Sequence, residues 1–99
     1  MDTSRCRAFL ASAENGTFTK AAEVLNYTTS GVSQLVTALE ADLGLTLLNR
    51  TRKGVHLTQA GERLLPIVRS FLQQEQRIFQ AAAEIKVLAP GRNDHFGLN

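Results

Sequence analysis

The chain has 99 residues, of which 43% are hydrophobic and 20% are charged. A chain of this length buries one modest core, which excludes a second full domain. Cys6 is the only cysteine, which excludes an internal disulfide and a cysteine-based metal cluster and fits a reduced, cytoplasmic setting. Nowhere do about 18 apolar residues run together, and the apolar run near the N-terminus is too short for a signal peptide, so we expect a soluble protein without a membrane partner.

Positive charge is concentrated in one short segment, although the formal net charge of the chain is only +2. The segment from 50 to 56 holds a cluster of basic residues and a histidine. They are Arg50, Arg52, Lys53 and His56. A phosphate backbone responds to local charge rather than to the total, so this segment is a candidate for contact with nucleic acid.

Helical spacing of apolar residues predicts a first helix from about Thr3 to Glu14, ended by Asn15-Gly16. Its apolar stripe consists of Cys6, Phe9, Leu10 and Ala13. Thr17 or Thr19 is then a candidate N-cap for a second helix, which leads to Asn26. Asparagine tolerates the left-handed conformation that a helix exit often needs, so we expect the chain to turn there.

Thr28 is a candidate N-cap for a third helix that ends near Leu43, because Gly44 comes next. The apolar side predicted to face the core consists of Val32, Val36, Leu39 and Leu43, with Leu35 at its edge. An advance of about 100° per residue places an uncharged polar set on another face, with Thr29 near the exposed N-terminal end. This set consists of Ser30, Ser33, Gln34 and Thr37. Two short helices joined by a tight turn predict a helix-turn-helix, whose second helix suits a DNA groove.

A basic hairpin is predicted after the third helix. Two short strands, at 46–50 and 54–57, flank a turn at 51–54 that carries Arg52 and Lys53. A tight basic turn beside a helix-turn-helix is well placed to contact phosphates or a narrow minor groove.

Other residues are also candidates for contact with the DNA backbone. Thr19 and Lys20 lie at the start of the second helix, where free N–H groups favour a phosphate, and Thr28 lies at the start of the third. Arg50, at a strand end, suits either the DNA backbone or an ion pair within the chain. The acidic candidates for that pair are Glu40 and Asp42.

One long helix is predicted from Gln59 to about Leu88, because Thr58 caps it and Pro66 is the only turn signal inside it. At Pro66 the helix either kinks or runs straight. Leu65, Leu72 and Phe79 recur every seven residues. A helix of about 30 residues extends some ~45 Å, well past a domain this small.

The apolar seam of this long helix has two alternative uses. Leu64 and Leu65 suit packing on the chain's own domain. For the remainder we expect pairing with the same helix of a second copy. The predicted interface consists of Val68, Phe71, Leu72, Ile78 and Phe79. The expected organisation is therefore a DNA-binding domain at 1–58, a dimerising linker helix at 59–88 and a flexible tail at 89–99.

Four segments together resemble the N-terminal DNA-binding region of LysR-type transcriptional regulators, over the span from Met1 to about Leu88. They are 18–25 (FTKAAEVL), 32–34 (VSQ), 39–44 (LEADLG) and 50–61 (RTRKGVHLTQAG). The resemblance rests on the order and spacing of these segments, because any one of them alone is weak evidence.

The resemblance implies a mainly α fold: a winged helix-turn-helix of three helices and a two-stranded wing, then a long helix that pairs antiparallel with its copy in a second subunit. It implies a cytoplasmic transcription regulator of bacterial type that is not an enzyme. The implied partners are double-stranded DNA and a second copy of the chain, and a higher oligomer is left open for the full protein. Such a homodimer places its third helices in successive major grooves of an interrupted palindromic operator.

The family's proteins normally continue into a two-lobed domain that binds a small effector. We expect the tail from 91 to 99 to approach the first strand of that domain, and the domain itself to lie outside this chain. No cofactor is expected within the chain. His56 and His95 lack a spaced cluster of metal ligands, and no catalytic arrangement is visible.

The third helix has no Arg or Lys between Thr28 and Leu39, so the contact of arginine with guanine is missing from it. Discrimination among sequences is therefore expected from uncharged groups and from DNA shape. The predicted base-reading residues are Thr29, Ser30, Ser33, Gln34 and Thr37. On composition alone, an ordinary solvated helix face is an equal alternative.

Two other hypotheses remain at this stage. One is an oligomerisation module whose winged domain contacts protein rather than DNA, because fold does not fix function. The other is a different winged-helix regulator, such as a molybdate-responsive type, which shares the DNA role and differs mainly in the region after the long helix.

Overall fold

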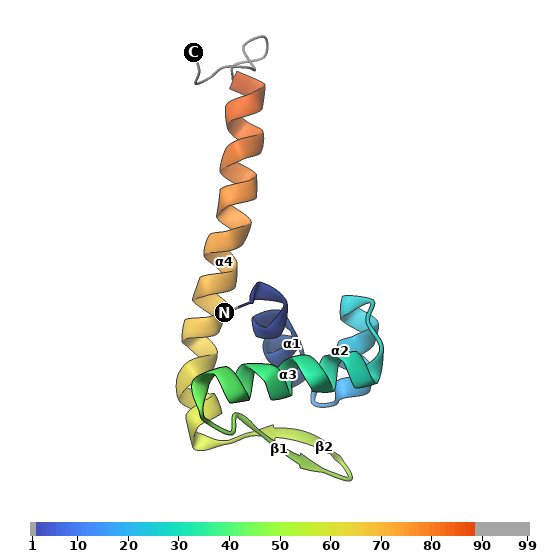
Figure 1. The fold of residues 1–99 in the computed structure, drawn as a ribbon. Helices are drawn as coiled ribbons and strands as arrows, with labels where there is room; N and C mark the ends of the chain where they lie inside the picture. Colours follow the sequence, from blue (N-terminus) through green and yellow to red (C-terminus); the bar gives the residue numbers. More distant parts are fainter. Residues whose placement is uncertain (1, 89–99) are drawn as a thin grey trace.

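The computed structural model describes residues 2–88. Its elements, in chain order, are α1 (Thr3–Asn15), α2 (Phe18–Leu25), α3 (Thr29–Leu43), β1 (Leu48–Thr51), β2 (Gly54–Leu57) and α4 (Gln59–Leu88). The first three helices pack together, the two strands form a wing beneath α3, and α4 leaves the domain as a long shaft (Figure 1). The predicted fold class, mainly α with a two-stranded wing and a long helix, is thereby confirmed. The predictions for 89–99 fall outside the described residues.

Threonine side chains begin three of the four helices. The hydroxyls of Thr17, Thr28 and Thr58 each accept a backbone N–H three residues further on, at 3.0 Å. Each bond satisfies an N–H that has no carbonyl partner in the first turn of a helix. Thr17 rather than Thr19 is therefore the N-cap of α2. Asp2, which the sequence pattern did not single out, caps α1.

The helices end where the sequence predicted. Asn26 comes after α2 in the left-handed conformation, with φ of 61°, and the turn that it makes leads directly to the cap of α3. Gly16 and Gly44 end α1 and α3 with positive φ angles of 79° and 69°. The turn at Asn26 joins α2 to α3 and so sets the angle between them.

The core lies where α1 packs on the other three helices and on β2. Its largest fully buried side chains are Phe9, Leu39, Leu47, Leu48, Val32 and Val36. Cys6 is buried among them, as predicted, and burial raises the pKa of its thiol. Leu43 does not belong to the core: its exposed fraction is 37%, because it lies in the last turn of α3, where the chain turns away.

The wing is an antiparallel pair in which Leu48 lies opposite Leu57. Its first strand begins at Leu48, two residues later than predicted, because the N–H of Leu47 bonds to α3 instead of pairing with the other strand. The Leu47 N–H donates to the Glu40 carboxylate on α3 at 2.8 Å, and the Leu47 carbonyl accepts the Thr58 N–H at 3.0 Å. On the other strand, the Val55 N–H donates to the carbonyl of Gly16 at 2.9 Å. These bonds fix the wing to the helical domain.

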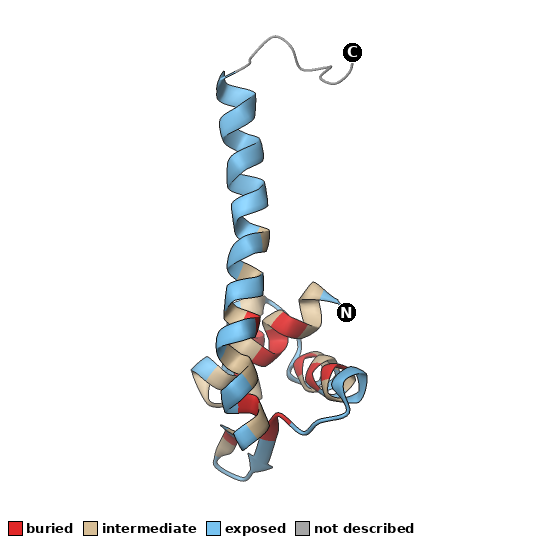
Figure 2. Cartoon of the chain, turned by 90° about the vertical axis from the view of Figure 1, so that its left-hand side faces the viewer, coloured by how far each residue is buried: buried red, intermediate tan, exposed pale blue. Residues whose placement is uncertain are grey.

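α4 runs without interruption through Pro66. Its first half packs on the domain, and two ion pairs join it to α1: Arg7 with Glu75 at 3.1 Å and Arg69 with Glu14 at 3.0 Å. Past this region nearly every residue of α4 is exposed (Figure 2). Within residues 2–88, no helix combines the length and the apolar character that crossing a bilayer requires.

Candidate nucleic-acid interface

α3 and the wing lie together at the end of the molecule opposite the far end of α4 (Figure 1). Four of the five predicted base-reading residues are exposed there, and the fifth, Ser33, is half-buried. The exposed ones are Thr29, Ser30, Gln34 and Thr37. No charged residue interrupts this stretch of α3, so the face offers hydroxyl and amide groups to a partner.

Two of these hydroxyls are already engaged within the chain. Thr37 Oγ1 donates to the carbonyl of Ser33 at 2.9 Å, one turn earlier on α3. Arg50 Nη2 donates to Thr37 Oγ1 at 2.8 Å, and Arg50 Nη1 donates to Ser33 Oγ at 2.9 Å. Nothing in the sequence signals these bonds, because Arg50 lies 13 and 17 residues away from its two partners.

The guanidinium of Arg50 has two further neighbours. Its Nη2 lies 3.7 Å from Glu40 Oε1, and its central carbon lies 4.9 Å from the centre of the Phe18 ring. Of the two acidic candidates, Glu40 is therefore the partner, and Asp42 pairs instead with Arg5 at 2.6 Å. At this distance the ring of Phe18 attracts the guanidinium of Arg50 by a cation–π contact, in addition to the attraction of Glu40.

The wing tip presents a different kind of cation. Arg52 and Lys53 are exposed in the turn between β1 and β2. Within residues 2–88, neither side chain takes part in a hydrogen bond, an ion pair or a ring contact. Thr19 and Lys20 are likewise exposed at the start of α2, and His56 is exposed on β2. The positive charge of the tip is thus open to an anionic partner.

The predicted interface residues on α4 divide into two groups. Phe71, Ile78 and Phe79 have exposed fractions of 44%, 67% and 71%. Val68 is 8% exposed and buried in the core of its own domain, and Leu72 packs against that core. The domain therefore covers Val68 and partly covers Leu72, and the dimer interface as a whole stays a prediction.

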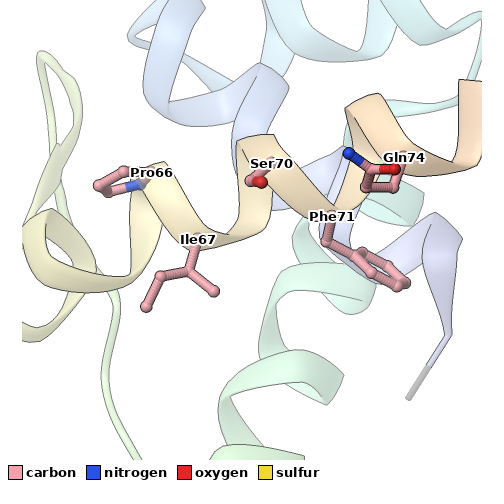
Figure 3. A pocket seen from close by; sticks show the side chains of 5 residues that line it. All are labelled: Pro66, Ile67, Ser70, Phe71 and Gln74. Atoms are coloured by element: carbon pink, nitrogen blue, oxygen red, sulfur yellow. The ribbon is translucent and has the colours of Figure 1, made fainter. Parts of the chain in front are cut away.

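A second apolar stripe on α4 faces away from the domain. Ile67 and Phe71 point to the same side of the helix and line a shallow hollow (Figure 3). Ile78 and Ile85 continue this stripe at steps of seven residues, and both are exposed. Ile67 was not predicted because the heptad through Leu65 marks the covered side of the helix instead.

Within the described part of the chain, no three side chains of His, Cys, Asp or Glu lie close enough to hold a metal ion. The second histidine of the sequence, His95, lies outside that part. The polar groups that do gather, on α3 and the wing, are suited to hydrogen bonds and charge contacts.

Three packed helices with an exposed third helix beside a two-stranded basic wing define a winged helix-turn-helix protein. The family model described as "Bacterial regulatory helix-turn-helix protein, lysR family" matches residues 3–62. The chain belongs to the LysR family of regulatory proteins.

Relatives of known name agree with this assignment. The uncharacterized HTH-type transcriptional regulator YvbU of Bacillus subtilis is 37% identical over 92 residues, which are 92% of this chain and 32% of the relative. The HTH-type transcriptional regulator YofA of the same organism is 42% identical over 80 residues, 78% of this chain and 28% of the relative. The chain therefore spans about a third of the length of these curated relatives.

Solved structures of the family match the fold closely. The crystal structure of a CbnR_DBD–DNA complex has a TM-score of 0.79 and 33% identity, covering 86% of this chain and 98% of that chain. The crystal structure of a BenM_DBD/benA site 1 DNA complex has a TM-score of 0.78 and 28% identity, covering 86% and 99%. The titles of both structures describe a complex with DNA.

Proposed function

We propose that this chain is the sequence-specific DNA-binding and dimerising part of a LysR-family transcription regulator that acts in the cytoplasm without catalysis. The observation that carries the proposal is the juxtaposition of an uncharged polar face on α3 with the open cations of the wing tip. The first offers groups that hydrogen-bond to base edges, and the second neutralises phosphates. The DNA complexes of CbnR_DBD and BenM_DBD support the same use of the fold.

Each element has a role in the proposed complex. α3 enters the major groove, and its base-reading set consists of Thr29, Ser30, Ser33 and Gln34. The wing and the start of α2 contact the DNA backbone or the minor groove. That set consists of Thr19, Lys20, Thr28, Arg52 and Lys53. Because α4 extends out of the domain with an apolar stripe, two copies pair through it and place two α3 helices on an interrupted palindrome.

Selection of bound duplexes from a random pool tests this proposal directly. We expect the chain to enrich one family of sequences with two-fold symmetry, and to bind the selected duplex at least about a thousandfold more tightly than a scrambled one. Both affinities are expected to fall steeply with salt, because phosphate neutralisation releases counterions. Equal affinity for both duplexes across a salt series contradicts base reading, and failure to bind any duplex favours a module that contacts protein.

Lys53→Ala and Gln34→Ala are expected to have different consequences for DNA binding. Lys53→Ala removes a phosphate contact, so binding to the selected and scrambled duplexes weakens alike and the salt slope falls by about one. Gln34→Ala removes a base contact, so affinity for the selected duplex falls roughly tenfold while affinity for the scrambled duplex is retained. Fluorescence anisotropy at several salt concentrations measures both. A Gln34 variant that weakens both duplexes equally contradicts its assigned role.

A further inference from the structure

The basic residues of the hairpin differ in how far they are committed to the fold. The side chains of Arg52 and Lys53 have no partner in the part of the chain that the structure describes. Arg50, on β1 beside them, is bound by groups from two helices. A phosphate contact is best made by an uncommitted cation, which suggests a different role for Arg50.

The partners of Arg50 lie on the two helices of the helix-turn-helix. Its two terminal nitrogens donate to Ser33 Oγ and Thr37 Oγ1, one turn apart on α3, at 2.9 and 2.8 Å. Its central carbon lies over the ring of Phe18, at the start of α2. Because the guanidinium is rigid and planar, holding two acceptors at once fixes its orientation. One side chain of β1 thus joins the wing to both helices.

Glu40 adds a second link between α3 and the same strand. Its Oε2 accepts the backbone N–H groups of Leu47 and Leu48 at 2.8 and 3.2 Å, and its Oε1 faces Arg50 at 3.7 Å. The Glu40 side chain is only 16% exposed, so these interactions are partly shielded from water. The strand is therefore held to α3 at its beginning by Glu40 and further along by Arg50.

These bonds also limit what the two hydroxyls of α3 have to offer to DNA. Thr37 Oγ1 uses its single proton on the carbonyl of Ser33 and accepts from Arg50. A hydroxyl has one donor and two acceptor positions, so Thr37 has no proton for a base. Ser33 Oγ has one acceptor position taken by Arg50.

We infer that Arg50 is a positioning residue that locks the wing to α3 through Ser33 and Thr37, and thereby sets the sequence preference of DNA binding rather than its overall strength. The inference rests on the proposed function and deepens it. Base reading depends on α3 and the wing reaching their contacts together, so loosening the lock lowers affinity for the selected duplex. It leaves the sequence-independent attraction to phosphates unchanged, because the wing tip keeps its cations.

Arg50→Lys is the sharpest test, because lysine keeps the charge but has no planar fork with which to hold both hydroxyls. Binding is measured for the duplex selected by the unaltered chain and for a scrambled duplex of equal length. We expect the ratio of the two affinities to fall about tenfold or more, with the affinity for the scrambled duplex and its salt slope unchanged. The matched control is Arg63→Lys, at an exposed position on α4 outside the proposed DNA-contact sets, and it is expected to leave both affinities unchanged. If Arg50→Lys retains the full ratio, the inference is wrong.

A double-mutant cycle with Thr37→Val separates positioning from direct base reading. Valine has nearly the shape of threonine, so this variant removes one acceptor of Arg50 without emptying space. If Thr37 acts through Arg50, the single variant Thr37→Val lowers the affinity ratio. The double variant then shows no larger loss than Arg50→Lys. If the fold losses of the two single variants multiply in the double variant, Thr37 contacts DNA directly and the inference is wrong.

The outcomes separate this inference from the proposed function. If the unaltered chain selects no duplex, the proposed function fails. If it selects one and Arg50→Lys preserves the preference, only the role of Arg50 fails. Arg50 is 40% exposed and lies outside the core, so the variant is expected to fold. Thermal unfolding of each variant checks this, and the Thr37→Val member of the cycle gives a second reading that leaves Arg50 unchanged.

Discussion

Replacing Ile78 by glutamate is expected to convert the chain from a dimer to a monomer and to lower its affinity for the selected duplex by about a hundredfold or more. The Ile78 side chain is 67% exposed in the single chain, beyond the part of α4 that packs on the domain. In the proposed dimer it lies between two α4 helices. A carboxylate there is buried without a partner, which costs several kcal/mol, and the loss of the second DNA-binding domain removes the gain from simultaneous binding.

Analytical ultracentrifugation at micromolar concentration measures the first effect, and a gel shift with the selected duplex measures the second. Gln80→Glu is the matched control. It adds the same charge two residues further on, and at about 100° per residue it projects from nearly the opposite side of the helix. The control is expected to remain dimeric. If Ile78→Glu also sediments as a dimer, the proposed interface does not use this stripe.

Gly61→Ala is expected to lower the free energy of unfolding by about 2–3 kcal/mol, and by more if the wing is displaced. Gly61 lies in the first turn of α4, with its backbone directly against the carbonyl of Leu47, and a Cβ there meets that oxygen and the side chain of Leu57. The carbonyl has no freedom to retreat because it accepts the Thr58 N–H. Thermal unfolding at fixed protein concentration measures the loss.

Gly44→Ala is the matched control for Gly61→Ala. Gly44 has a φ of 69°, but a Cβ added to it meets no atom within 4 Å. Only the strain of the left-handed conformation remains, about 1 kcal/mol for alanine. Equal losses of unfolding free energy in the two variants contradict the close docking of α4 on the chain before the wing.

The helices of this fold were predictable because their ends are encoded locally. A threonine hydroxyl caps the start of a helix by accepting an N–H three residues further on. An asparagine ends α2 and a glycine ends α3. Each of these signals acts within one turn of chain. Apolar spacing then identified the buried sides of α1 and α3. The same locality explains why the position of the wing was nearly right.

Features that depend on packing between distant segments were not predictable. The seven-residue recurrence on α4 marks an apolar side, but it does not tell which part of that side the chain's own domain covers. The domain buries Val68 and partly covers Leu72. The start of β1 was misplaced because the N–H of Leu47 bonds to Glu40 on α3 instead of pairing with the other strand. Similarly, the lock formed by Arg50 depends on the fold that brings β1 beside α3.

The close docking of Gly61 on Leu47 has a mechanical consequence for a dimer built on α4. The helix is continuous over its 30 residues, and its first turn contacts Leu47 just before the wing. A rotation of the whole helix therefore also moves the chain next to the DNA-facing end. In the proposed dimer, a small change in the crossing angle of the two α4 helices therefore shifts both wings at once. The separation between the two half-sites is thereby coupled to whatever moves the far ends of the helices.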